Sequence, residues 1–176
     1  MMEAVHRYER TVNQVMGDGI MALFGAQIAH EDHAIRACYA ALAMQAGMRR
    51  YSDEVRRTHG LAVHFRVGLN SGEVVARGIT NDLHMDYSAI GQTVHLTARM
   101  EQLATPGSIL LTPATLRLVE GLVQVHTLGP MPVQGLVEPV EVAELVGVSA
   151  LRRRLHAVAR CIPRSSRPSK PLPETG

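Results

Sequence analysis

The chain has 176 residues, of which 46% are hydrophobic and 19% charged, and its formal net charge is +2. This length suits one globular domain, not clearly two. With only 3% aromatic residues and no Trp, the sequence lacks the stacking platforms of a protein that binds single-stranded nucleic acid. No apolar run approaches the roughly 20 residues of a membrane span. We therefore expect neither a nucleic-acid partner nor a membrane segment.

The cysteine content and the N-terminus indicate a cellular compartment. Cys38 and Cys161 lack the spacing of metal ligands, and the N-terminus lacks the apolar segment of a signal peptide. A reduced, cytoplasmic chain is the simplest interpretation.

The first third of the chain predicts a hairpin and a long helix. Met1–Arg10 is polar and helical in pattern, and Tyr8–Gly25 predicts two strands. The strands turn at Gly17–Gly19, where two glycines allow a sharp reversal and place the Asp18 carboxylate at the tip. A helix then runs from about residue 29 to 59. The His and acidic residues at its start could form a metal cluster, but acidic groups at the positive end of a helix are the favoured interpretation.

The middle of the chain alternates strands and turns before a second helix. The pattern predicts strands at Val63–Leu69, Glu73–Ile79 and Met85–Ile90, and a helix from Thr93 to about Leu103. Thr93 is the expected N-cap. The helix places His95 and Arg99 four residues apart on one face. A basic face after a strand-to-helix turn suits a phosphate-bearing ligand, although these residues alone favour a solvated surface.

The last part of the chain predicts a closing set of strands and a tail. The expected elements are a strand at Ser108–Leu111, a helix from Thr112 to about residue 120 with Thr112 as its cap and Pro113 at its first position, and strands at Val123–Leu128 and Val140–Val146. The hairpins predict an α+β fold, a largely antiparallel sheet with helices on one face. We expect this domain to cover 1–147, a basic linker helix to cover 148–163, and a disordered Pro- and Ser-rich tail to cover 164–176. The final Leu-Pro-Glu-Thr-Gly is interpreted as a tag or a chance match to a sortase motif.

Two stretches together resemble the catalytic domain of the class III nucleotidyl (adenylate/guanylate) cyclases. They are Val15–Gly25, with the Gly-Asp-Gly turn, and Asp86–Glu101, with the sequence DYSAIGQTVHLTARME. The resemblance runs from about Val12 to Leu145, and bacterial members with a cyclase domain ahead of an ATPase are the most similar type. It implies a ferredoxin-like cyclase fold and conversion of a nucleoside triphosphate, ATP more than GTP, to the 3′,5′-cyclic nucleotide and pyrophosphate in intracellular signalling. The site would be shared by two subunits, in a homodimer or with a complete cyclase partner.

The resemblance also implies roles for individual residues. The candidates are Asp18 as a ligand of Mg²⁺ or Mn²⁺, Arg99 and His95 as catalytic residues, and Ser88, His84, Gly17 and Gly19 as contacts to the substrate. A guanidinium fork suits a phosphate that gains charge in the transition state. His95 stands where the family usually has Asn. The Ser88 hydroxyl can donate or accept, so it does not choose between adenine and guanine.

One part of the family pattern has no counterpart in this sequence. The family's first strand carries the other metal-binding Asp of a two-metal site, and nothing before the hairpin resembles it, so we expect an N-terminally truncated chain whose fold lacks that strand. Mg²⁺ is usually held by a pair of carboxylates together with phosphates, and the chain alone is therefore expected to be a weak or inactive enzyme. The alternative function is a catalytically inactive, cyclase-like dimerisation module that regulates an ATPase or a transcription partner.

Overall fold

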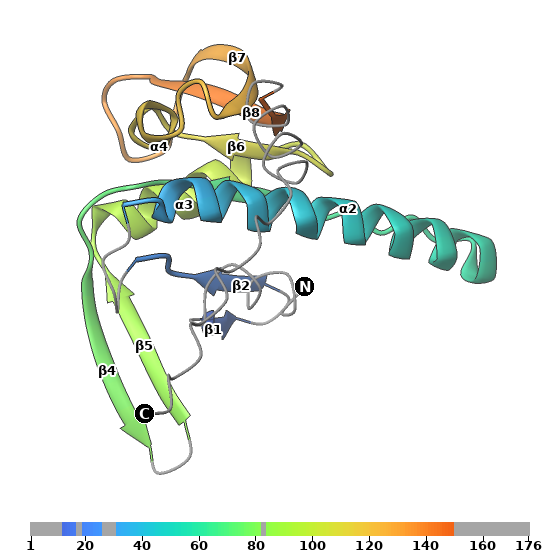
Figure 1. Ribbon diagram of the computed structural model, residues 1–176, viewed down its shortest axis with the longest axis horizontal. Helices are drawn as coiled ribbons and strands as arrows, with labels where there is room; N and C mark the ends of the chain where they lie inside the picture. The colour runs from blue at the N-terminus through green and yellow to red at the C-terminus, as the bar shows by residue number, and fades with distance from the viewer. Residues whose placement is uncertain (1–11, 17–18, 26–30, 82–83, 150–176) are drawn as a thin grey trace, which may run out of the picture.

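The computed structural model describes residues 12–16, 19–25, 31–81 and 84–149 (Figure 1). The strands are β1 (Val12–Met16), β2 (Gly19–Ala22), β3 (Val67–Leu69), β4 (Val75–Asn81), β5 (His84–Ile90), β6 (Ile109–Leu111), β7 (Val123–Met131) and β8 (Val140–Val148), and the helices are α2 (His33–His59), α3 (Gln92–Leu103) and α4 (Pro113–Leu118). Within these ranges, no helix is both long and apolar enough to span a membrane. The expected helix at 1–10 and the tail from residue 150 onward lie outside the described residues.

The largest sheet has four strands in the order β3-β6-β8-β7. β3 and β6 pair in parallel, whereas β6 with β8 and β7 with β8 pair antiparallel. The strands β1 and β2 form one antiparallel pair and β4 and β5 form another. The predicted α+β fold with a largely antiparallel sheet is therefore confirmed.

The helices α2 and α3 cover opposite faces of the four-stranded sheet. Ile109 and Leu111 of β6 pack with the buried residues of α2, whereas Leu110, between them, packs with Met100 of α3. Successive side chains of a strand point to opposite faces, so the three residues of β6 serve two separate cores. The prediction that the helices lie on one face was wrong, because the sequence shows which positions are apolar but not which helix covers them.

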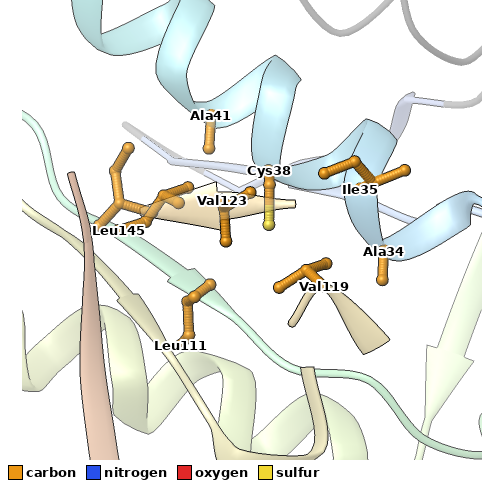
Figure 2. Close-up of a cluster of buried hydrophobic side chains, with 9 residues drawn as sticks. Ala34, Ile35, Cys38, Ala41, Leu111, Val119, Val123 and Leu145 are labelled. Carbon is orange, nitrogen blue, oxygen red and sulfur yellow. The ribbon is translucent and has the colours of Figure 1, made fainter. Parts of the chain in front are cut away.

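The core under α2 is built from small and aliphatic side chains. Figure 2 shows Cys38 and Ala41 of α2 facing Val123 and Leu145 from the strands. Small residues on α2 let the helix lie close to the sheet. Burial raises the pKa of the Cys38 thiol to about 12, since a thiolate would lose its hydration there. Cys38 is therefore a packing residue that stays protonated at neutral pH.

The C-terminal half of α2 projects beyond the strands (Figure 1). Its buried residues all lie between Ala34 and Ala41, and the helix continues to His59. It ends at Gly60, which has a left-handed φ of 69° and donates its N–H to the Arg56 carbonyl at 3.1 Å. Glycine adopts this conformation without strain, which explains why the predicted end of the helix was correct.

A network of hydroxyls and one amide joins the ends of β3 and β6 to the starts of α3 and α4. Thr112 caps α4 by accepting from the Thr115 N–H at 3.4 Å, and its hydroxyl donates to Asn70 Oδ1 at 2.7 Å. Asn70 Nδ2 in turn donates to the Thr93 carbonyl at 2.9 Å. The predicted Thr112 cap is confirmed, and the same side chain connects two helices through Asn70.

Thr93 does not cap α3. The N-cap position is Gly91, which makes no side-chain cap, and the Thr93 hydroxyl donates to the Glu73 carbonyl at 2.7 Å. A hydroxyl that donates to a neighbouring segment is not available to its own helix terminus, so tertiary contact replaced the expected local one.

Thr112→Val is expected to lower the free energy of unfolding by about 2 kcal/mol, because the cap and a buried hydrogen bond are both lost. Thr112 is 1% exposed, so water cannot replace its partners. Thr112→Ser keeps the hydroxyl and should retain most of the stability. Urea unfolding followed by circular dichroism measures both variants. A Thr112→Val variant as stable as the parent, with a loss of stability only in the Thr112→Ser variant, would show that packing of the methyl group matters, not the hydroxyl.

Several element boundaries differ from the predicted ones. Residues 63–66 precede β3 and are not part of a strand, β4 begins at Val75, and β5 begins at His84. At the other end of the domain, β8 continues to Val148. Propensity patterns locate elements better than they locate their ends.

Candidate functional site

The candidate site is centred on the turn between β5 and α3. Gly91 occupies this turn with a φ of 145°, a conformation that residues with a Cβ rarely adopt. Its carbonyl accepts the first helical N–H groups, from Val94 at 3.1 Å and His95 at 3.3 Å. The end of β5 and the first turn of α3 are therefore held in a fixed relation.

The structure brings His95 and Arg99 to neighbouring positions on α3. His95 is exposed and Arg99 is partly exposed. Arg99 Nη1 donates to Gln102 Oε1 at 2.7 Å, and in the part of the chain that the structure describes it forms no ion pair with a carboxylate. Among these residues no acid neutralises its positive charge, and an anionic ligand could take the place of Gln102.

α3 is fixed against β3 by a close backbone approach at Gly68. A Cβ built at Gly68 would lie 2.4 Å from the Thr97 carbonyl oxygen and 2.4 Å from the Glu101 nitrogen. Next to it, Arg66 Nε lies 3.0 Å from Glu101 Oε1 in a half-exposed ion pair. Because Thr97 lies between the two candidate catalytic residues of α3, this approach sets the position of the helix face that carries them.

The two candidate base-contacting residues are both on β5. Ser88 is opposite Arg77 of β4, and His84 is opposite Asn81 at the far end of the pair. The backbone of Ser88 is thus close to the turn at Gly91, whereas His84 begins the strand. Their predicted contacts with a nucleotide base stay predictions.

The glycine-flanked Asp18 falls between the strands β1 and β2 in the sequence. β1 and β2 pair with Met16 opposite Gly19, and Gly19 begins β2. β1 also contacts β5. The predicted hairpin is therefore confirmed and lies next to the strand that carries Ser88, while Gly17 and Asp18 themselves lie outside the described residues.

No metal site is formed by the described residues alone. Among them, no group of three His, Cys, Asp or Glu side chains is arranged to hold an ion. The acidic residue at the start of α2, Asp32, instead pairs with Arg36 at 2.8 Å. Asp18, the predicted metal ligand, lies outside this part of the chain.

Sequence reasoning missed two residues that position the site. Gly68 lies inside the predicted strand Val63–Leu69, where a glycine is a signal for close backbone approach. Asn70 follows that strand, and no local pattern shows that its amide reaches the Thr93 carbonyl.

Comparison with known proteins agrees with the fold and with the order of these elements. The model of the adenylate and guanylate cyclase catalytic domain matches residues 3–145. Adenylate cyclase 1 of Rhizobium meliloti is 26% identical over 148 residues, which is 83% of this chain and 22% of that protein. The alpha-1 subunit of rat soluble guanylate cyclase is 30% identical over 61% of this chain and 15% of its own length. The chain thus spans about a fifth or less of these two curated relatives.

Solved structures of cyclase domains also superpose on this chain. The guanylyl cyclase Cya2 superposes with a TM-score of 0.73 at 30% identity, over 85% of this chain and 76% of that one. The guanylate cyclase domain of RhGC from Catenaria anguillulae, solved in complex with GTP, has a TM-score of 0.71 at 26% identity, over 84% and 78% of the two chains. The protein belongs to the adenylate and guanylate cyclase catalytic domain family.

Proposed function

We propose that this domain forms half of a nucleotidyl cyclase site that converts a nucleoside triphosphate, with ATP preferred, to the 3′,5′-cyclic nucleotide and pyrophosphate. The observation that carries the proposal is Arg99: a guanidinium with no carboxylate partner among the described residues, on a helix held against the sheet at Gly68. A delocalised, permanently charged fork at a fixed position suits a phosphate group that gains charge during the reaction. The proposed setting is intracellular signalling in the cytoplasm.

The other site residues are proposed to bind and orient the substrate. His95, one turn before Arg99, can donate a hydrogen bond to the same phosphate or to the ribose. Ser88 and His84 would contact the base, and Gly17 and Gly19 would let the hairpin backbone approach the phosphates. Base contacts made by one hydroxyl and one imidazole favour neither purine strongly, because both groups can donate or accept a hydrogen bond. The preference for ATP is therefore tested by comparing the two substrates.

Domains of this family use divalent metal ions. We propose that Asp18 is one ligand of a Mg²⁺ or Mn²⁺ pair, which would balance phosphate charge and lower the barrier to attack by the ribose 3′ oxygen. Among the described residues no group of three His, Cys, Asp or Glu side chains could hold an ion, and the sequence offers no counterpart of the family's other metal-binding Asp. A single carboxylate binds Mg²⁺ poorly, and turnover by this chain alone should be slow and should need excess metal.

Domains of this family bind nucleoside triphosphates and form dimers. We propose that the partner here is a second copy or a complete cyclase domain, and that an ATPase or regulatory domain receives the signal. Because metal ligands and transition-state residues would come from different subunits, a monomer would contain no complete site.

Cyclic nucleotide formation by the purified chain tests this function. With ATP and then GTP in excess Mn²⁺, we expect slow formation of cyclic AMP and slower formation of cyclic GMP. Product analysis by chromatography distinguishes cyclisation from hydrolysis to a nucleoside diphosphate. Faster turnover of GTP would reverse the proposed base preference without affecting the reaction type.

A second function is favoured by His95, which stands where the family usually has Asn. In this alternative the domain is inactive and acts as a dimerisation module that regulates an ATPase or a transcription partner. A chain that is folded by circular dichroism and dimeric in solution, but forms no cyclic nucleotide with either substrate, would support the module over the enzyme.

A further inference from the structure

A cavity open to solvent lies beside α2. It has a volume of about 260 Å³ and is lined by the C-terminal half of α2, residues 63–65 and Gly107. Residues 63–65 lead into β3 and Gly107 leads into β6, so the cavity is at the amino ends of these two parallel strands. Arg99, by contrast, is on α3, which covers the opposite face of the sheet from α2, and no residue of α3 lines the cavity. The cavity is therefore separate from the proposed cyclase site.

Hydrogen bonds join the three segments that line this cavity. The Gln45 amide on α2 donates to the Gly107 carbonyl, and the Gly107 N–H donates to the Phe65 carbonyl at 2.8 Å. Further along α2, the Ser52 hydroxyl accepts from the Val63 N–H at 3.1 Å. Segments distant in the sequence are thus joined around one space, which favours a preformed site over an accidental gap.

The lining combines apolar side chains with excess positive charge. Met48, Val63 and Phe65 supply apolar surface, and Arg49 and Arg56 supply two guanidinium groups. These arginines are seven residues apart, two helical turns, and so lie on the same side of α2.

The two guanidinium groups differ in their partners. Arg56 Nη2 lies 2.7 Å from Asp53 Oδ1, whereas Arg49 forms no ion pair in the part of the chain that the structure describes. Asp53 is the sole acid in the lining, so one positive charge is left without a counterpart. Arg49 is therefore the side chain available to an incoming anion.

We propose that this cavity binds a small organic anion, a carboxylate or phosphate carried on an apolar group, with Arg49 binding the anionic head. The apolar body would contact Met48 and Phe65. The volume is below the roughly 300–1,000 Å³ of sites for drug-sized ligands, so the ligand is smaller than a nucleotide triphosphate. This binding does not depend on cyclase activity.

The test is an NMR titration of the full chain with benzoate and with phenyl phosphate, and with benzamide as the uncharged counterpart of benzoate. We expect both anions to shift the backbone amide signals of Gly107 and the end of α2, and benzamide to bind at least about tenfold more weakly, because a charge-assisted hydrogen bond is lost. Absence of shifts at these residues with either anion, at millimolar concentrations, would overturn the proposal.

Two arginines provide a matched pair of variants. Arg49→Gln should weaken benzoate binding by at least about tenfold. Arg50→Gln removes the same charge from the adjacent exposed position, which does not line the cavity, and should change affinity by less than about twofold, because exposed charges are well screened. Equal weakening by the two variants would show a diffuse effect of net charge and would contradict a site at Arg49.

A third variant changes the affinity in the opposite direction. Asp53→Asn removes the carboxylate that pairs with Arg56 and repels an anion, and it should tighten benzoate binding about threefold or more. Circular dichroism of all three variants confirms that the exposed substitutions leave the fold intact. Weaker binding by the Asp53→Asn variant would contradict the assigned position of the anionic head.

Discussion

Gly68→Ala is expected to be strongly destabilising. The added Cβ would lie 2.4 Å from two backbone atoms of α3, the Thr97 oxygen and the Glu101 nitrogen, and 2.9 Å from the Met100 Cβ. Backbone cannot rotate away as the end of a side chain can, so β3 and α3 would have to separate. Forced overpacking typically costs 1–3 kcal/mol and sometimes more, and we expect about 3 kcal/mol from urea unfolding.

Gly47→Ala is the matched control for this change. Gly47 lies inside α2, and a Cβ built there meets nothing within 4 Å. Because alanine favours a helix interior over glycine by about 0.5–1 kcal/mol, this variant should be slightly more stable than the parent. A Gly68→Ala variant as stable as the parent would show that α3 does not lie as close to β3 as the structure has it.

Arg99→Ala is expected to lower the kcat of cyclic nucleotide formation by about 10²–10³, the usual effect of removing one donor that stabilises transition-state charge. Its effect on KM should be much smaller, because the interaction proposed for Arg99 strengthens as charge develops on the phosphate. The assay can use the chain alone in excess Mn²⁺ or the chain with a complete cyclase partner. Stability should be nearly unchanged, because the hydrogen bond from Arg99 to Gln102 is exposed.

Gln102→Ala separates the charge of Arg99 from its orientation. Gln102 accepts the hydrogen bond from Arg99 Nη1 at 2.7 Å, so this variant frees the guanidinium without removing it. Activity should fall less than about tenfold. If both variants lose the same activity, the hydrogen bond to Gln102 positions Arg99; if neither does, Arg99 is not a catalytic residue.

Local signals predicted most of the elements. The pairing of β1 with β2, the long helix that ends before Gly60, and the Thr112 cap of α4 were all confirmed. Each rests on a preference that acts over a few residues: glycine at a sharp turn or a helix end, and a hydroxyl at a helix start.

Features that depend on contacts between distant segments could not be predicted in the same way. The Thr93 hydroxyl bonds to Glu73, 20 residues away, and not to its own helix. The placement of α2 and α3 on opposite faces depends on how the residues of β6 alternate between two cores. At the cavity beside α2, a hydrogen bond likewise joins Gln45 to Gly107 across 62 residues, a separation at which no sequence pattern indicates contact.

The candidate site was predicted in part. The order of the hairpin, β5 and α3 in the sequence indicated the cyclase family, and the model of that family matches residues 3–145. The structure adds that Arg99 donates a hydrogen bond to Gln102. It also shows that Gly68 allows the backbone of α3 to lie close to β3. The roles of Ser88, His84 and Asp18 stay predictions.

The most direct measurement is the rate of cyclic AMP formation per mole of the purified chain, in excess Mn²⁺, as the chain concentration is raised. A composite site shared by two subunits predicts slow turnover that rises with concentration as dimers form, and that is lost in the Arg99→Ala variant. A folded, dimeric chain with no cyclic AMP at any concentration, or with a rate that Arg99→Ala leaves unchanged, would contradict a cyclase site built around Arg99.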